Sequence, residues 1–207
     1  MEIELKYLLT EDIAKDRIFA DHHLLEIKDP DSEETIPMRA IYLDTEDGSL
    51  RKKEMAFRVR LEDERRIATL KWGGSAEGGL HVRGELNVPV DKDFVQNPSM
   101  EVFRGSEIYE EIAEAVGNKK LVPVMEMEFT RRQMRVDTGK SISVVSLDDG
   151  VIRTAKGEVP IAELEVELYS GDQEDMMHLG EELAAKYNLV PSNHSKFQKG
   201  LMLLGLA

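Results

Sequence analysis

The feature that most limits the possible folds of this chain is a strict alternation of charged and apolar side chains in several separate stretches. In the first stretch, the charged residues Glu2, Glu4 and Lys6 alternate with two apolar residues. A period of two residues is typical of a β-strand, because successive side chains of a strand point to opposite faces. The alternation recurs in residues 55–61, 67–71, 80–88 and 161–168. The chain is therefore predicted to contain many strands that have one charged and one apolar face.

The charges on these strands are sorted by sign. Carboxylates gather on the first strand and on residues 161–168, whereas the cations Arg58, Arg60, Lys71 and Arg83 lie on strands between them. A two-layer sandwich would place such faces in solvent, but solvated faces usually mix the two signs. The sorting instead favours a closed antiparallel barrel of about eight strands, with a charged interior and with helices packed on its apolar outside. The fold class is thus mainly β, with additional helices.

The segments between the strands give further expectations. Helices are predicted over residues 10–26, 106–116, 172–187 and 192–204. The glycines of residues 73–79 predict a flexible loop, Gly150 predicts a turn between two short strands, and residues 42–45 predict a turn that shapes the barrel.

Composition limits the other properties of the chain. Its 207 residues, of which 41% are hydrophobic, are enough for one core, so residues 1–207 are predicted to form a single domain. The chain has no cysteine and no apolar run of 18 residues, and its first residues are acidic, which favours a cytoplasmic location without a membrane span. A net charge of −14 disfavours nucleic acid and anionic membranes as partners. The sequence is compatible with a monomer or a homodimer.

The residue types of the barrel interior point to phosphate chemistry. Carboxylates without cysteine, and without a histidine pair at metal-ligand spacing, favour the hard cations Mg²⁺ or Mn²⁺. Several arginines and lysines in a confined space suit an anion with many oxygens, such as a chain of phosphates. Together they are the parts needed for metal-assisted phosphoryl hydrolysis or transfer, and no P-loop pattern is present.

Eight short motifs, in order along the chain, resemble those of the CYTH superfamily, the triphosphate tunnel metalloenzymes. They are Glu2-x-Glu4-x-Lys6, Tyr42-Leu43-Asp44-Thr45-x-Asp47-x-x-Leu50, Phe57-Arg58-Val59-Arg60, Thr69-Leu70-Lys71, Arg83-x-Glu85, Leu147-Asp148-x-Gly150, Glu163-x-Glu165-x-Glu167 and Ser195-Lys196-x-x-Lys199-Gly200. Each motif is short, but their number and order cover nearly the whole chain. Lys199 departs from the arginine usual in the family.

The resemblance implies a role for each matching residue. The divalent metal would be held by Glu2, Glu4, Asp148, Glu163, Glu165 and Glu167, and the triphosphate by Lys6, Arg58, Arg60, Lys71, Arg83, Lys196 and a basic residue of the strand at 121–136. Alternation within that strand favours Arg132 for the last position, whereas a β-bulge would substitute Arg131. Lys6 and Glu85 are candidates for catalysis, Glu85 by positioning the attacking water. Alternatively, Arg83 and Glu85 form a structural salt bridge.

The reactions implied by the resemblance share this cradle of cations. They are hydrolysis of inorganic triphosphate, hydrolysis of thiamine or nucleoside triphosphate, and cyclisation of ATP as in class IV adenylate cyclases. Aromatic residues make up only 6% of the chain, and no aromatic cluster is interleaved with the cradle in the sequence. Inorganic triphosphate is therefore the first choice. A non-catalytic module that binds polyphosphate or nucleotide is the alternative of another class.

Overall fold

The computed structural model describes residues 1–10, 15–62 and 64–207 as a closed eight-stranded antiparallel barrel with one additional short strand, which confirms the predicted fold class. The strands are β1 (Glu2–Leu8), β2 (Glu34–Thr45), β3 (Met55–Glu62), β4 (Arg65–Glu77), β5 (Leu80–Pro89), β6 (Leu121–Asp137), β7 (Ser141–Thr154), β8 (Gly157–Gly171) and β9 (Val190–Pro191). Their order around the barrel is β5-β4-β3-β2-β6-β7-β8-β1, and pairing of β1 with β5 closes it. The two-residue β9 pairs with β1.

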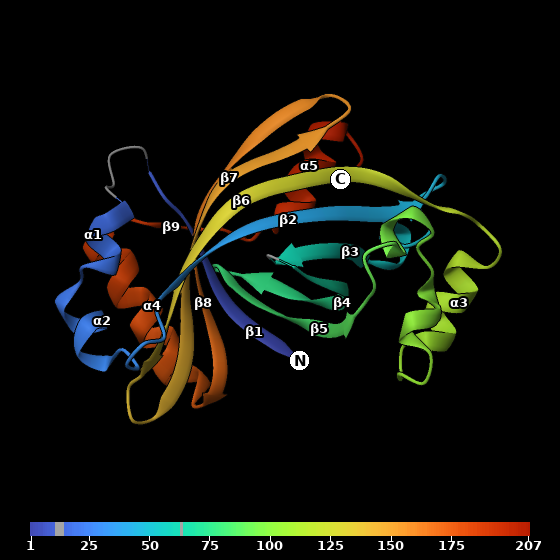
Figure 1. The fold of residues 1–207 in the computed structure, drawn as a ribbon. Coiled ribbons are helices and arrows are strands. Elements are labelled where there is room, and N and C mark those ends of the chain that lie inside the picture. Colours follow the sequence, from blue (N-terminus) through green and yellow to red (C-terminus); the bar gives the residue numbers. More distant parts are fainter. Residues whose placement is uncertain (11–14, 63) are drawn as a thin grey trace.

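Most helices lie against the outside of the barrel, at two opposite ends of the molecule (Figure 1). The helices are α1 (Lys15–Phe19), α2 (His22–Ile27), α3 (Tyr109–Val116), α4 (Gln173–Tyr187) and α5 (Lys196–Leu204), with the 3₁₀ helices η1 (Arg51–Lys53), η2 (Phe94–Gln96) and η3 (Met100–Phe103). In the described part of the chain, none of these helices has the length and apolar character needed to span a bilayer.

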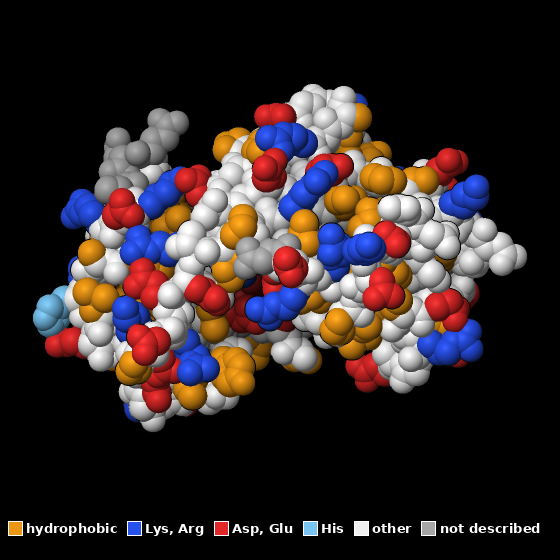
Figure 2. Space-filling model, viewed as in Figure 1, with side chains coloured by type: hydrophobic (Ala, Val, Ile, Leu, Met, Phe, Trp, Pro, Cys, Tyr) orange, Lys and Arg blue, Asp and Glu red, His pale blue; other side chains and the backbone are white. Residues whose placement is uncertain are grey.

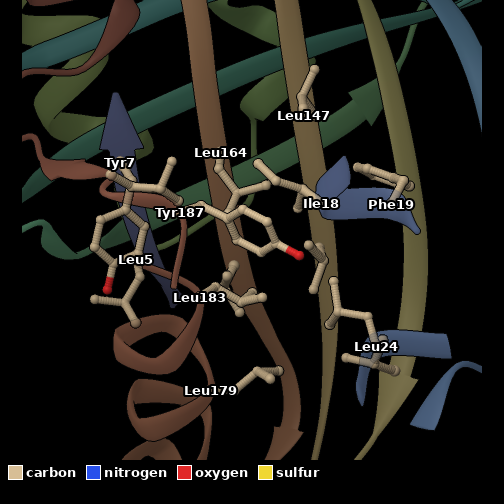
Figure 3. Close-up of a cluster of buried hydrophobic side chains, with 14 of the residues drawn as sticks. Leu5, Tyr7, Ile18, Phe19, Leu24, Leu147, Leu164, Leu179, Leu183 and Tyr187 are labelled. Carbon is tan, nitrogen blue, oxygen red and sulfur yellow. The ribbon is translucent and has the colours of Figure 1, made fainter. Parts of the chain in front are cut away.

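Alternation along the strands builds two apolar cores on the outer face. In the first, Leu5 of β1 and Leu164 of β8 pack with Ile18 of α1 and Leu183 of α4 (Figure 3). In the second, Phe57 of β3 and Leu70 of β4 pack beneath η3 and α3, with Phe57 edge-on to Phe103. Both cores leave the opposite side chains of the same strands, which are charged, to face the barrel interior. The helices therefore cover the apolar faces, as the pattern predicts.

The helix α5 lies differently from the others. Its Phe197 and Leu201 belong to a third core, together with side chains of β2, β6, β7 and β8. Four members of this core, Met38, Tyr42, Phe129 and Phe197, also line the interior cavity. The helix α5 thus closes part of the barrel interior with apolar contacts.

Three local expectations are wrong in detail. The predicted helix 10–26 is divided, since α1 ends at Phe19 and Asp21 caps a second helix, α2; its expected beginning at residues 11–14 lies outside the described residues. The predicted loop at residues 73–79 is confirmed only at Gly78 and Gly79, which turn between β4 and β5; residues 73–77 belong to β4, in which a register shift between Trp72 and Ser75 absorbs the first two glycines. Gly150 lies inside the single strand β7, where an added Cβ would come within 2.2 Å of the Glu128 carbonyl oxygen, so this glycine permits close strand packing instead of a turn.

Candidate active site

Charged side chains from most of the strands face one interior cavity of about 420 Å³. The described charged residues that line it are Glu2, Glu4, Lys6, Glu34, Arg58, Arg60, Glu62, Arg65, Lys71, Arg83, Glu85, Arg131, Glu165, Glu167 and Lys196. On the face of the molecule in Figure 2, in contrast, charges of both signs are intermixed. The cavity therefore collects ten of the thirteen residues predicted to hold substrate or metal; Asp148, Glu163 and Arg132 are not part of its lining.

One part of the cavity wall is a dense network of buried ion pairs. The Lys196 Nζ atom lies 2.7 Å from Asp148 Oδ2, 2.8 Å from Glu163 Oε2 and 2.7 Å from Glu165 Oε1. Lys6 also pairs with Glu165, and Lys199 pairs with Glu163. Burial alone would lower the pKa of Lys196, but the three carboxylates outweigh it and hold that pKa well above its usual value. Here Asp148, Glu163 and Glu165 act as partners of cations.

Arg131, and not the predicted Arg132, faces this network. The guanidinium of Arg131 donates to both carboxylate oxygens of Asp148 at 2.7 Å and to Glu165 at 2.7 Å. Arg132 points to the outside, where it pairs with Glu33 and lies over the ring of Phe19. No bulge is involved: alternation along β6 holds, but Glu126, Glu128 and Arg132 lie on the outer face of the strand, whereas Phe129, Arg131 and Gln133 face the cavity.

A second network joins side chains of β1, β4 and β5. Lys71 Nζ lies 2.6 Å from Glu2 Oε1 and 2.6 Å from Glu85 Oε2. Arg83 donates to Glu2 and to Glu4, at 2.7 Å each. Although burial opposes it, the proximity of Lys71 and Arg58 holds the pKa of Glu85 well below its usual value. Arg83 and Glu85 thus share neighbours but do not form the pair with each other that was the predicted alternative.

The cavity has a corner with surplus positive charge. Arg58 Nε is buried without a hydrogen-bond partner among the described residues, and Arg60 Nε, although 2.6 Å from Glu62, is not aligned for a bond. Burial, followed by repulsion from Arg58, lowers the pKa of Arg60 to about 10. Two desolvated guanidiniums that repel each other favour binding of an anion at this corner.

Another corner has surplus negative charge. Glu167 stands opposite Glu4 in the β1–β8 pair and has no ion-pair or hydrogen-bond partner among the side chains described. Burial, followed by repulsion from Glu2 and Glu4, raises the pKa of Glu167 to about 7. A carboxylate that has no cationic partner is suited to bind a hard divalent cation. In the described ranges, however, no three acidic or histidine side chains converge into a ready-made metal site, so the six predicted ligands do not form one group.

Aromatic side chains that sequence reasoning missed also line the cavity. Tyr42, Phe129 and Phe197 come from β2, β6 and α5, and the rings of Tyr42 and Phe197 stack at 4.9 Å between centroids. They are 87 and 68 residues apart along the chain (129 − 42 and 197 − 129), so no local pattern groups them. The expectation of no aromatic cluster beside the cradle is therefore wrong.

The motif at residues 42–50 has a structural role, but its turn lies later than predicted: residues 42–45 end β2, and the chain turns at residues 46–50. Asp44 is buried and accepts hydrogen bonds from the backbone N–H groups of Thr45 at 2.7 Å and Leu50 at 2.9 Å. It also pairs with Arg51. Only Tyr42 of this motif reaches the cavity.

Lys196 is positioned by the segment that precedes α5. Ser195 caps α5 in a capping box with Gln198, and Ser192 N–H donates to the carbonyl oxygen of Lys6 at 2.9 Å. The buried His81 bonds the Ser192 carbonyl oxygen at 2.8 Å. These contacts fix the start of α5, and with it Lys196, against β1.

Comparison with known proteins identifies the family. The CYTH domain matches residues 1–201. An inorganic triphosphatase from Haemophilus influenzae is 32% identical over 162 residues, which cover 78% of this chain and 44% of that protein. The chain thus spans less than half the length of this curated relative.

Solved structures share the fold. A putative adenylyl cyclase from Hippeastrum, described as having a dominant triphosphatase activity, aligns with a TM-score of 0.71 at 20% identity over 100% of this chain and 97% of that one. A putative adenylate cyclase from Bacillus halodurans aligns with a TM-score of 0.58 at 19% identity over 96% of each chain. At such identities, the likeness concerns the fold alone.

Proposed function

Because the chain belongs to the CYTH domain family, we propose that it is a divalent-metal-dependent triphosphatase that hydrolyses inorganic triphosphate inside its barrel. The inorganic triphosphatase relative supports this choice of reaction. The observation that carries it is the enclosed cavity itself, which has surplus cations at one corner and, at another, the carboxylate Glu167 without a cationic partner among the described side chains. A linear anion that carries a divalent cation would satisfy both corners at once.

The cationic side chains would hold the phosphates. Arg58 and Arg60 have N–H donors to spare, and guanidinium groups bind phosphate oxygens through two parallel bonds. Lys6, Lys71, Arg83, Arg131 and Lys196 would surround the remaining oxygens. In this proposal Asp148, Glu163 and Glu165 keep Lys6, Arg131 and Lys196 charged and in place.

Glu2, Glu4 and Glu167 would hold Mg²⁺ or Mn²⁺, since Glu167 has no cationic partner among the described side chains and its charge is repelled by Glu2 and Glu4. When bound, the cation would neutralise developing charge on the phosphoryl group. Glu85, kept ionised by Lys71 and Arg58, would accept a hydrogen bond from the attacking water and orient it.

The aromatic wall supports inorganic triphosphate over a nucleotide. Tyr42 and Phe197 stack on each other with 17° between the ring planes, and both are less than 9% exposed. The two facing sides of these rings are therefore in contact with each other and leave no slot between them for a base.

The test is phosphate release from inorganic triphosphate, ATP and thiamine triphosphate, measured side by side with Mg²⁺ and with Mn²⁺. We expect the fastest release from inorganic triphosphate and none with excess chelator. The variant R58Q/R60Q should lose activity, whereas R39Q, which alters an exposed arginine on the outer face of β2, should keep it. Formation of only cyclic AMP and pyrophosphate from ATP would replace the proposal with a cyclase, and binding without turnover would replace it with a binding module.

A further inference from the structure

The charge along the inward face of β3 changes sign at the last residue of the strand. Arg58, Arg60 and Glu62 follow one another at every second position, and all three line the cavity. Successive members of such a row are about 7 Å apart along a strand. The row therefore begins with two cations and ends with a carboxylate. The proposal above gives a role to both arginines but none to Glu62.

Glu62 lies at the end of the cavity that opens to solvent. It stands opposite Arg65 in the β3–β4 pair. Arg65 and Glu34 also line the cavity, and both are exposed. The side chain of Glu62 itself is 17% exposed, so it belongs to the inner side of this opening.

The other end of the row is covered by the helix α5. Tyr42 stands opposite Arg58 in the β2–β3 pair, and its ring stacks on Phe197 of α5. Lys196, the first residue of this helix, lines the cavity beside them. A phosphate chain that is held by the arginines and is too long for the cavity would therefore extend past Glu62.

Glu62 acts on the outer arginine of the row. Its Oε1 atom lies 2.6 Å from the Arg60 Nε atom, and the side chains of both residues are 17% exposed. A phosphate group bound to Arg60 would thus have this carboxylate as its neighbour on the side of the opening. The next phosphate outward would lie beside Glu62, where partial burial strengthens the repulsion between like charges. The charge of Arg65 would offset little of it, because that side chain is exposed and its charge is screened by solvent.

We propose that Glu62 is a specificity-determining residue of this site, whose carboxylate ends the row of cations on β3 and disfavours linear polyphosphates that continue beyond a third phosphate. The identity of the anion rests on the proposed function. The position of the carboxylate rests on the pairing of β3 and on the contact with Arg60. One consequence is that the accepted length of a polyphosphate can be altered without changing the residues that hold its phosphates.

The variant E62Q removes the charge of Glu62 and keeps the size of the side chain. We expect its kcat/KM for inorganic tetraphosphate to rise about tenfold, because the repulsion is lost, and its kcat/KM for inorganic triphosphate to stay within about threefold of the wild type. ATP tests whether charge or space is responsible: its nucleoside carries no charge, so its kcat/KM should not rise. The matched control is E126Q, which alters an exposed carboxylate paired with Arg39 on the outer face and should leave all three values unchanged.

A second measurement does not depend on turnover. In excess chelator, inorganic tetraphosphate should raise the melting temperature of E62Q more than that of the wild type or of E126Q, whereas triphosphate should raise all three alike. The inference is overturned if the ratio of tetraphosphate to triphosphate kcat/KM is the same in E62Q and in the wild type, or if ATP or E126Q shows an equal rise. If the wild type hydrolyses no triphosphate but E62Q gains binding of tetraphosphate alone, the proposed function fails and the role of Glu62 in selecting chain length stands; without that gain, both fail.

Discussion

Arg131 and Asp148 face each other across the β6–β7 pair and form a two-pronged ion pair. The Arg131 Nε and Nη2 atoms lie 2.7 Å from the Asp148 Oδ1 and Oδ2 atoms, respectively. Burial opposes the charge of Arg131, but Asp148 and Glu165 outweigh it and raise the pKa of Arg131 well above its usual value. The two parallel hydrogen bonds of this pair fix the orientation of the Arg131 guanidinium relative to Asp148.

Replacing Arg131 should cost stability as well as activity. The variant R131Q leaves the buried Asp148 with Lys196 as its remaining cation, and loss of one partner of a buried pair costs about 3 kcal/mol or more. Denaturant-induced unfolding measures the free energy of unfolding. The matched control is R132Q, next in the chain, whose outward ion pairs are partly exposed and should be worth about 1 kcal/mol or less. Equal losses in the two variants would contradict the inward position of Arg131.

Replacing Glu167 should raise stability and lower activity. At neutral pH its charge is repelled by Glu2 and Glu4, so E167Q should stabilise the protein by about 1–2 kcal/mol when measured with a chelator. Since the folded-state pKa is raised from 4.5 to about 7, this residue destabilises the wild type progressively as pH rises between those values, and E167Q should lack that component. Turnover by E167Q should need more Mg²⁺ than the wild type, in a titration of phosphate release against metal concentration. A variant that is less stable and binds metal normally would show that Glu167 has a structural role instead.

The barrel was predictable because its signal is local and repeated. Each strand shows its two faces within five to eight residues, so Glu2, Glu4 and Lys6, or Arg58 and Arg60, reveal the inward side without any knowledge of their neighbours. Because the signs of charge are segregated by strand, the charged faces are then expected to line the barrel interior and not a solvated surface. Both steps need only the spacing along one strand.

The predictions that are wrong concern features that depend on contacts between segments far apart in the sequence. On β6 both Arg131 and Arg132 fit the local pattern, and the choice depends on the partners across the sheet, Asp148 for one and Glu33 for the other. The stacking of Tyr42 on Phe197 joins residues 155 positions apart (197 − 42), beyond any periodicity. Gly150 appears as a turn residue in sequence, but its role is set by the backbone of β6.

Asp21 should make stability depend on pH in the acid range. Its carboxylate caps α2, accepts a hydrogen bond from the Tyr187 hydroxyl at 2.6 Å and forms an ion pair with Lys186 at 2.6 Å. These contacts join α2 to α4. Burial opposes ionisation, but these bonds outweigh it and lower the pKa of Asp21 from 3.8 to about 2. Its contribution is therefore complete above about pH 4 and is lost as pH falls towards 2.

The variant D21N should lose about 1–2 kcal/mol of unfolding free energy at pH 7 and little at pH 2, in denaturant titrations across that range. The matched control is D172N, which changes the N-cap of α4, an aspartate without a cationic partner among the described residues. Its pH dependence should follow that of the wild type. If the difference between D21N and the wild type is the same at pH 2 as at pH 7, the charge of Asp21 contributes nothing.

Ligand binding should stabilise the barrel through its surplus charges. Arg58 and Arg60 repel each other in the folded protein, and a bound triphosphate with Mg²⁺ would remove that cost while adding its own binding energy by mass action. At a ligand concentration 100-fold above Kd, the gain is about 2.7 kcal/mol, which for a domain of this size raises the melting temperature by about 5–10 °C. The variant R58Q/R60Q should show little of this shift, and R39Q should show all of it, since Arg39 lies on the outer face. An unchanged melting temperature of the wild type at saturating triphosphate and Mg²⁺, or an equal shift in R58Q/R60Q, would mean that the anion does not bind at this corner of the cavity.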